Sequence, residues 1–135
     1  MGATLSLKEV TCHYPPSSPQ NDKTLVHQAV VNNLSLTLDD GEIGSLLGAS
    51  GCGKTTILRS IAGFHAISEG EIKLGARTLA NKTRHLAPEK RSVGMVFQDY
   101  ALFPHLTVAQ NILFGIKKDS QNNQTKTCNE LLDLV

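Results

Sequence analysis

The spacing of apolar residues predicts a β-rich beginning to the chain. Apolar and polar residues alternate along Leu5–Thr11, and they alternate again at the end of Ala29–Leu38, where three leucines fall on one face. Between these two segments, Pro15–Asp22 has the composition of a loop. Glu71–Leu74 and Arg77–Leu79 are two short segments on either side of a Gly-Ala turn. These four segments predict strands, which we expect to form an antiparallel β portion.

A different pattern occupies the centre of the chain. Ile43–Leu47 is a short apolar run, which is typical of a buried parallel strand because both faces of such a strand are covered. Apolar residues then recur at helical spacing over Ile57–Ala62, and Gly63 is well placed to end that helix. Val93–Phe97 predicts one more apolar strand. The central order is therefore a strand, a glycine-rich loop and a helix.

The remaining residues predict short helices separated by polar sequence. Val108–Phe114 predicts a helix with Thr107 as its N-cap. Lys117–Lys126 has no apolar residue and predicts a linker. Thr127 and Glu130 then match a capping box, which predicts that a helix starts at this point.

Composition narrows the class of protein. The 135 residues are 40% hydrophobic and 19% charged, which suits one small globular domain or part of a larger one. The formal net charge of +1 argues against electrostatic binding to nucleic acid, and the lack of Trp argues against a base-stacking platform. No apolar run approaches the roughly 20 residues of a transmembrane helix. The first residues do not resemble a signal peptide, so we expect a cytoplasmic protein.

The central loop, GASGCGKTT, carries the chemistry. Gly48, followed at fixed spacing by Gly53, Lys54 and Thr55, fits the P-loop pattern of phosphate-binding proteins. Glycine lets a diphosphate approach the backbone closely, and successive N–H groups then converge on the anion. The following helix points its positive N-terminal end at the same place. Lys54 adds a full charge toward the terminal phosphates, and the Thr55 hydroxyl is suited to ligate magnesium.

A P-loop alone does not name a reaction, because kinases, GTPases, motor proteins and transport ATPases share it. A guanine-reading N-K-x-D motif would favour a GTPase. The segment Asn81–Arg84 begins in that way but ends in Arg, so it fails. Two further alternatives stay open: a binding or assembly module without turnover, and a chain that does not fold alone.

Three segments in order make the chain resemble the ATP-binding subunit of ATP-binding cassette transporters. Gly41–Phe64 resembles the Walker A region of that family, Ser68–Leu79 resembles a second family segment, and Arg91–Gly115 matches the glutamine loop and the segment after it. The similarity is closest to bacterial importers of the ferric iron, polyamine and sugar type, and it leans toward ferric iron. It implies an α/β fold, with a P-loop NTPase core and an N-terminal antiparallel β portion, truncated before the helical subdomain and the Walker B strand.

The resemblance also implies roles for individual residues. Tyr14 stands where the family places an aromatic ring that stacks on adenine. Gln98 stands where a glutamine helps to hold magnesium and senses the γ-phosphate, and Ser50 and Thr56 stand where the family contacts the γ- and α-phosphates. The implied catalytic residues are Lys54 and Gln98, and the implied metal ligands are Thr55 and Gln98. The implied nucleotide-binding residues are Tyr14, Gly48, Ala49, Ser50, Gly51, Cys52, Gly53, Lys54, Thr55, Thr56 and Gln98.

Other motifs of the family are not in the sequence. It has no LSGGQ-like signature, no apolar strand ending in the paired acidic residues of Walker B, and no switch histidine after such a strand. Hydrolysis needs carboxylates that orient the attacking water and secure the magnesium. We therefore expect a truncated piece of a longer protein, inactive alone. Residues 1–116 would be the N-terminal part of the cassette domain, and residues 117–135 a linker and the start of the helical subdomain.

For the intact protein, the resemblance implies the ATPase subunit of a membrane importer, with ATP and Mg²⁺ as cofactors. It would lie on the inner face of the cell membrane and work as a pair of cassettes that sandwich two Mg-ATP molecules. The apolar segment Tyr100–Leu106 would face the transmembrane permease subunits. A periplasmic or lipid-anchored solute-binding protein would take part indirectly, and no nucleic-acid partner is expected.

Overall fold

The computed structural model describes residues 3–14, 29–99, 101–115 and 121–133. The chain divides into two compact units, residues 1–95 and residues 96–135. Among the described residues, no helix has the length and apolar character needed to cross a membrane. The predicted loop Pro15–Asp22 lies outside the described residues. The predicted division at residue 116 follows family subdomains rather than compactness, and it stays a prediction.

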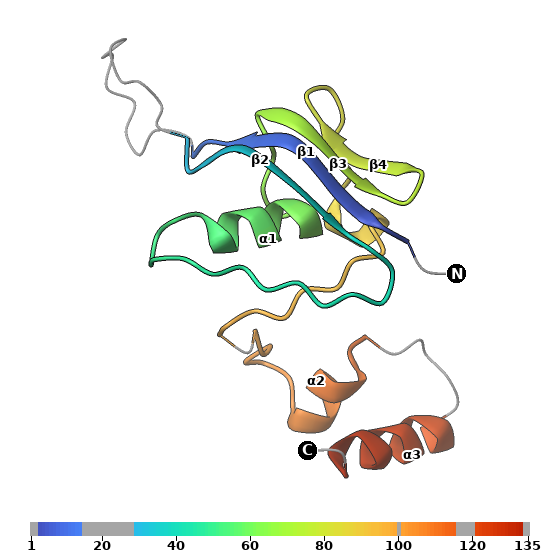
Figure 1. The fold of residues 1–135 in the computed structure, drawn as a ribbon. Coiled ribbons are helices and arrows are strands. Elements are labelled where there is room, and N and C mark those ends of the chain that lie inside the picture. The colour runs from blue at the N-terminus through green and yellow to red at the C-terminus, as the bar shows by residue number, and fades with distance from the viewer. Residues whose placement is uncertain (1–2, 15–28, 100, 116–120, 134–135) are drawn as a thin grey trace. The chain divides into compact units, whose positions relative to one another are not determined.

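The first unit is built on a four-stranded antiparallel sheet (Figure 1). Its strands are β1 (Leu5–Cys12), β2 (Val31–Leu38), β3 (Glu69–Leu74) and β4 (Arg77–Asn81). The spatial order is β2-β1-β3-β4, so β1 pairs with both β2 and β3. The four strands predicted from apolar alternation and turn residues are therefore confirmed, with ends shifted by one or two residues.

A bulge in β1 bends the sheet around Glu9. The register of β1 shifts by one residue against both of its neighbours at this point, and Glu9 has a φ of 51°. The N–H of Glu9 donates a hydrogen bond of 2.9 Å to Ser35 Oγ instead of to the ladder. Across from it, Gly70 has a φ of 86°, and a Cβ there would collide with the carbonyl oxygens of Lys8 and Glu9. The bulge sets the direction in which β1 continues toward Tyr14.

Helix α1 (Lys54–Ala62) lies along one face of this sheet (Figure 1). The prediction of a helix ended by Gly63 is confirmed, because Gly63 forms the C-cap in the left-handed conformation at a φ of 99°. Ile57 is buried against the sheet, and Ser60 Oγ lies 3.4 Å from Cys12 Sγ on β1. Burial raises the pKa of the Cys12 thiol, which favours its neutral form. The core consists of Leu7, Val10, Cys12, Val31, Ile57, Ile67, Ile72, Leu79 and Ala80.

A fully buried arginine holds the C-terminal end of α1. Arg91 has no exposed surface, and its guanidinium donates to the carbonyl oxygens of Ser60 at 2.6 Å and Ile61 at 3.1 Å. It also donates to Leu86 O at 2.6 Å and lies 3.1 Å from His85 Nδ1. Burial lowers the pKa of Arg91, but a guanidinium stays protonated at neutral pH. A cation at this end of the helix is stabilised by the helix dipole and satisfies carbonyl groups that have no helical partner.

Two predicted strands of the core are wrong in this structure. Ile43–Leu47 and Val93–Phe97 are not strands, and Ile43, Leu47 and Val96 are 98%, 90% and 97% exposed. A cavity of about 290 Å³ separates part of the first segment from the sheet and from α1. A strand needs a hydrogen-bonded neighbour, and among the described residues none pairs with either segment. Apolar sequence alone therefore did not produce extended pairing.

The second unit contains two helices, α2 (Val108–Leu113) and α3 (Gln121–Leu132). The predicted Thr107 cap is confirmed: Thr107 Oγ1 accepts from Gln110 N, and Gln110 Oε1 accepts from Thr107 N in a reciprocal capping box. The linker predicted over Lys117–Lys126 is wrong from Gln121 onward, and Thr127 lies inside α3 rather than at its start. Gln and Lys are good helix formers, so a polar segment of this composition can extend a helix.

We predict that Arg91→Met destabilises the first unit by about 3 kcal/mol or more, because buried carbonyl groups lose their donor. The free energy of unfolding of the 135-residue chain, from urea denaturation, measures this loss. Arg59→Met is the matched control, since Arg59 is exposed in the last turn of the same helix, and we expect a change within about 0.5 kcal/mol. Equal losses for the two variants would contradict the role assigned to Arg91.

Candidate nucleotide-binding site

The glycine-rich loop leads directly into the N-terminal end of α1. Gly53 is the N-cap at a φ of 93°, and no side chain caps this end among the described residues. A Cβ on Gly53 would lie 2.6 Å from Val30 O and 2.9 Å from Val31 Cγ2, so only glycine fits there. The first turn of α1 has no acidic residue. Its N–H groups and the positive end of the helix dipole are therefore available to an anion.

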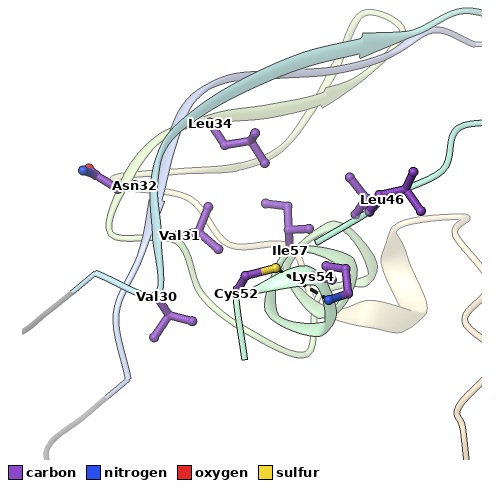
Figure 2. Close-up of a pocket in the computed structure, with 10 residues that line it drawn as sticks. Val30, Val31, Asn32, Leu34, Leu46, Cys52, Lys54 and Ile57 are labelled. Carbon is purple, nitrogen blue, oxygen red and sulfur yellow. Dashed lines mark hydrogen bonds between the residues drawn. The ribbon is translucent and has the colours of Figure 1, made fainter. Parts of the chain in front are cut away.

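The Lys54 side chain folds back over the loop. Its Nζ donates hydrogen bonds of 2.8 Å to Gly48 O and to Ala49 O, and it lies 3.6 Å from Cys52 Sγ. Figure 2 shows Lys54 beside Cys52, with Ile57 of α1 close by. The ammonium group thus lies within the loop that the sequence assigns to phosphate. A positive charge, a helix N-terminus and backbone N–H groups are brought together, as the P-loop pattern predicted.

A mainly apolar cavity adjoins the loop. It has a volume of about 270 Å³ and separates the beginning of β2 from the loop and α1 (Figure 2). Its lining residues are Val30, Val31, Asn32, Leu34, Leu46, Leu47, Cys52, Gly53, Lys54 and Ile57. An apolar wall beside a cationic loop provides surfaces for both the uncharged and the charged parts of a nucleotide.

The two threonines that follow Lys54 differ in exposure. Thr55 is exposed, so its hydroxyl is accessible to a ligand. Thr56 is 4% exposed, and its Oγ1 lies 3.2 Å from the hydroxyl of Tyr14, within hydrogen-bond distance. Tyr14 follows the end of β1, and this contact brings it to the start of α1 although 42 residues separate it from Thr56. The structure therefore unites Tyr14 with the P-loop helix.

The remaining predicted loop residues are exposed, and they include Ser50, Gly51 and Cys52. Gln98 is also exposed, and it belongs to the second unit, residues 96–135. Its predicted role as a magnesium ligand therefore stays a prediction. The roles of the individual loop residues toward phosphate likewise stay predictions.

Sequence reasoning missed two features of this site. The His65 ring packs against Tyr14 with ring centroids 4.9 Å apart. Val30 and Val31 restrict the residue at position 53 to glycine. No motif marks either feature, because each contact joins residues far apart in the sequence. A scattered histidine and the first residues of a strand gave no signal by themselves.

An exposed apolar segment lies in the second unit. Tyr100 is outside the described residues, but Leu102 and Val108 are each 70% exposed and Phe103 is 38% exposed. The Phe103 ring stacks in a tilted manner on Phe114, at a centroid distance of 4.3 Å. A cavity of about 270 Å³ is lined by Leu102, Phe103, Pro104, Leu106, Val108, Asn111 and Ile112.

One side chain of α2 holds this apolar segment in shape. Asn111 Oδ1 accepts from Phe103 N at 2.9 Å, and Nδ2 lies 3.2 Å from Phe103 O. The same Nδ2 group also donates to Leu106 O at 3.2 Å and Thr107 O at 3.0 Å. Because these bonds satisfy the backbone of the segment locally, its apolar side chains can remain exposed.

Comparison with known proteins places the chain in a family. The family model described as "ABC transporter" matches residues 31–135. The spermidine/putrescine import ATP-binding protein PotA of Thermotoga maritima is 49% identical over 108 residues, which cover 78% of this chain and 28% of that protein. The Fe(3+) ions import ATP-binding protein FbpC of Fusobacterium nucleatum is 52% identical over 88 residues, or 65% and 23% of the two chains. The chain thus spans about a quarter of the length of these relatives.

A solved structure has the same fold. It is a dimeric ATP-binding cassette in a post-hydrolysis state, bound to ADP and Pi, with a TM-score of 0.73 and 26% identity. The match covers 96% of this chain and 56% of that one. The predicted fold class, an α/β P-loop NTPase core with an antiparallel β portion, is therefore confirmed, although two of the predicted strands do not form here.

We predict that Gly53→Ala destabilises the first unit by about 2 kcal/mol or more and abolishes pyrophosphate binding, because the new Cβ collides with Val30 O. Denaturation and calorimetric titration measure the two effects. Gly41→Ala is the matched control: Gly41 has a φ of 78° but no atom within 4 Å of an added Cβ. We expect it to cost about 1 kcal/mol and to keep pyrophosphate binding. Equal effects of the two substitutions would contradict this account of the loop.

We predict that Asn111→Ala opens the segment 103–107, because the Phe103 amide loses its acceptor and three carbonyl groups lose a donor. Hydrogen exchange should show a loss of protection at the Phe103 amide that corresponds to about 1–3 kcal/mol. Asn129→Ala, at an exposed position of α3, should leave this exchange rate unchanged. Unaltered protection in Asn111→Ala would show that the side chain does not hold the segment.

Proposed function

The chain belongs to the ABC transporter family, and on that premise we propose that it forms the ATP-binding part of a membrane importer. The observation that carries the proposal is the uncapped N-terminus of α1, with the Lys54 ammonium folded over the glycine-rich loop beside it. The printed names of the relatives, import ATP-binding proteins for polyamines or Fe(3+) ions, support the same function.

The residues of the loop fit the phosphates of a nucleotide. Lys54 would exchange its two carbonyl partners for oxygens of the β- and γ-phosphates. Ser50 would contact the γ-phosphate, and the free N–H groups at the start of α1 would bind the phosphates from the other side. Thr56 would contact the α-phosphate after its hydroxyl releases Tyr14. Tyr14 would then present its ring to adenine.

The exposed hydroxyl of Thr55 suits Mg²⁺, which prefers oxygen ligands. Gln98 would supply a second oxygen from its side-chain amide. Mg²⁺ would neutralise charge on the phosphate oxygens. Lys54 and Gln98 would act as catalytic residues in the longer protein, where the carboxylates that this sequence lacks would orient the attacking water.

The exposed segment Leu102–Leu106 supports a contact with the permease subunits of the transporter. Its apolar side chains are presented on a segment that Asn111 holds in one shape. The protein would lie at the inner face of the cell membrane and would pair with a second ATP-binding subunit. A solute-binding protein would take part indirectly. Relatives for both polyamines and Fe(3+) ions are similar to this chain, so ferric iron import stays a prediction.

A second candidate function is nucleotide binding or assembly without turnover. It is favoured by the sequence, which lacks the signature, Walker B and switch histidine motifs. The two candidates differ in phosphate release and agree in nucleotide binding. Lys54 and the loop are needed for both.

We predict that Mg-ATP stabilises the 135-residue chain against thermal unfolding, by about 2.7 kcal/mol at a concentration of 100 times Kd. Lys54→Ala should remove this stabilisation, because the phosphates lose their main cationic partner. Lys82→Ala is the matched control, as Lys82 is exposed in the turn after β4. A scanning melt with and without Mg-ATP, together with a phosphate-release assay, measures both properties.

We expect binding without phosphate release from this chain. An ATP shift that survives Lys54→Ala would contradict the proposed site. Steady phosphate release by the 135-residue chain would contradict the expectation that the missing motifs are needed.

A further inference from the structure

The structure assigns His65 a role in base recognition: we propose that it is a positioning residue that supports the Tyr14 ring from behind and thereby sets the affinity for the base of the nucleotide. The inference rests on the proposed function. It goes beyond it by adding a residue that neither the P-loop nor the motifs of the sequence point to.

The Tyr14 ring is held from two directions. Its centroid lies 4.9 Å from that of His65, with 53° between the ring planes, which is a favourable tilted aromatic arrangement. Its hydroxyl lies 3.2 Å from Thr56 Oγ1 at the start of α1. Tyr14 still keeps 46% of its surface exposed. A ring that is supported on one side and accessible elsewhere can stack on a base with little loss of side-chain entropy.

The position of His65 is itself fixed by backbone contacts. His65 lies in the segment between α1 and β3, and Ser68 N in that segment donates to Thr11 O at 2.8 Å. Ser68 Oγ lies 2.9 Å from His13 Nδ1, the residue before Tyr14. These two contacts attach the segment to the end of β1. They place His65 and Tyr14 side by side although 51 residues separate them in sequence.

The hydrogen bonding of His65 does not explain its presence. Its Nε2 atom is buried and has no hydrogen-bond partner within the described part of the chain. The contact that the structure shows for this side chain is the ring contact with Tyr14. The face of the imidazole, rather than its nitrogen atoms, is therefore the feature in use. A flat ring such as phenylalanine would serve the same purpose.

The test compares a ligand that has a base with one that has none. Calorimetric titration of the 135-residue chain with Mg-ATP and with Mg-tripolyphosphate gives both affinities below the melting temperature of each variant. His65→Ala should weaken ATP binding by about threefold to tenfold, the range expected from losing an aromatic pair. It should leave tripolyphosphate binding unchanged. His65→Phe should keep the ATP affinity, because it keeps the ring.

A double variant separates positioning from general packing. In the Tyr14→Ala background, His65→Ala should cause no further loss of ATP affinity, since its effect acts through the Tyr14 ring. An equal loss for both ligands, a loss in His65→Phe as large as in His65→Ala, or additive losses in the double variant would overturn the proposal. So would unchanged ATP affinity in His65→Ala.

The same titration distinguishes this proposal from the proposed function. If the unsubstituted chain binds neither ligand, the proposed function is wrong and the role of His65 is wrong with it. If the unsubstituted chain binds both ligands, Lys54→Ala loses both, and His65→Ala leaves their ratio unchanged, only the role of His65 is overturned.

Discussion

Helix α1 has two ends that the structure treats in opposite ways, and the site depends on this difference. At its C-terminal end, the buried guanidinium of Arg91 donates to the carbonyl oxygens of Ser60 and Ile61, and Gly63 completes the cap. At its N-terminal end, the described residues provide no side-chain cap. The helix can therefore be held firmly by one end while the N–H groups of the other remain available to phosphate.

The antiparallel sheet brings distant residues to that open end. The bulge at Glu9 sets the direction of β1, and β1 then leads to Tyr14. The segment before β3 is attached to the same strand end through Ser68, which puts His65 against Tyr14. On the other side, the beginning of β2 lies so close to Gly53 that no side chain fits at this position. Each of these contacts is a consequence of strand order rather than of local sequence.

The exposed segments show the limits of apolar pattern as a guide. Ile43–Leu47 has the composition of a buried strand, yet Ile43 and Leu47 are almost fully exposed. A strand is defined by pairing with a neighbour, and neither this segment nor Val93–Phe97 pairs among the described residues. Segments of the second unit show a related effect, because the polar residues from Gln121 onward join a helix that their composition did not predict.

The sequence by itself determined the elements whose cause is local: the alternating strands of the sheet, helix α1 with its glycine C-cap, the Thr107 capping box and the P-loop pattern. Backbone preference and hydrogen bonding within a few residues are enough to specify these features. Only the tertiary structure decided the burial of Arg91, the contact of Tyr14 with Thr56 and the stacking of His65 on Tyr14. Those contacts join residues separated by 30 to 51 positions, and their geometry depends on how the sheet twists and where its strands end.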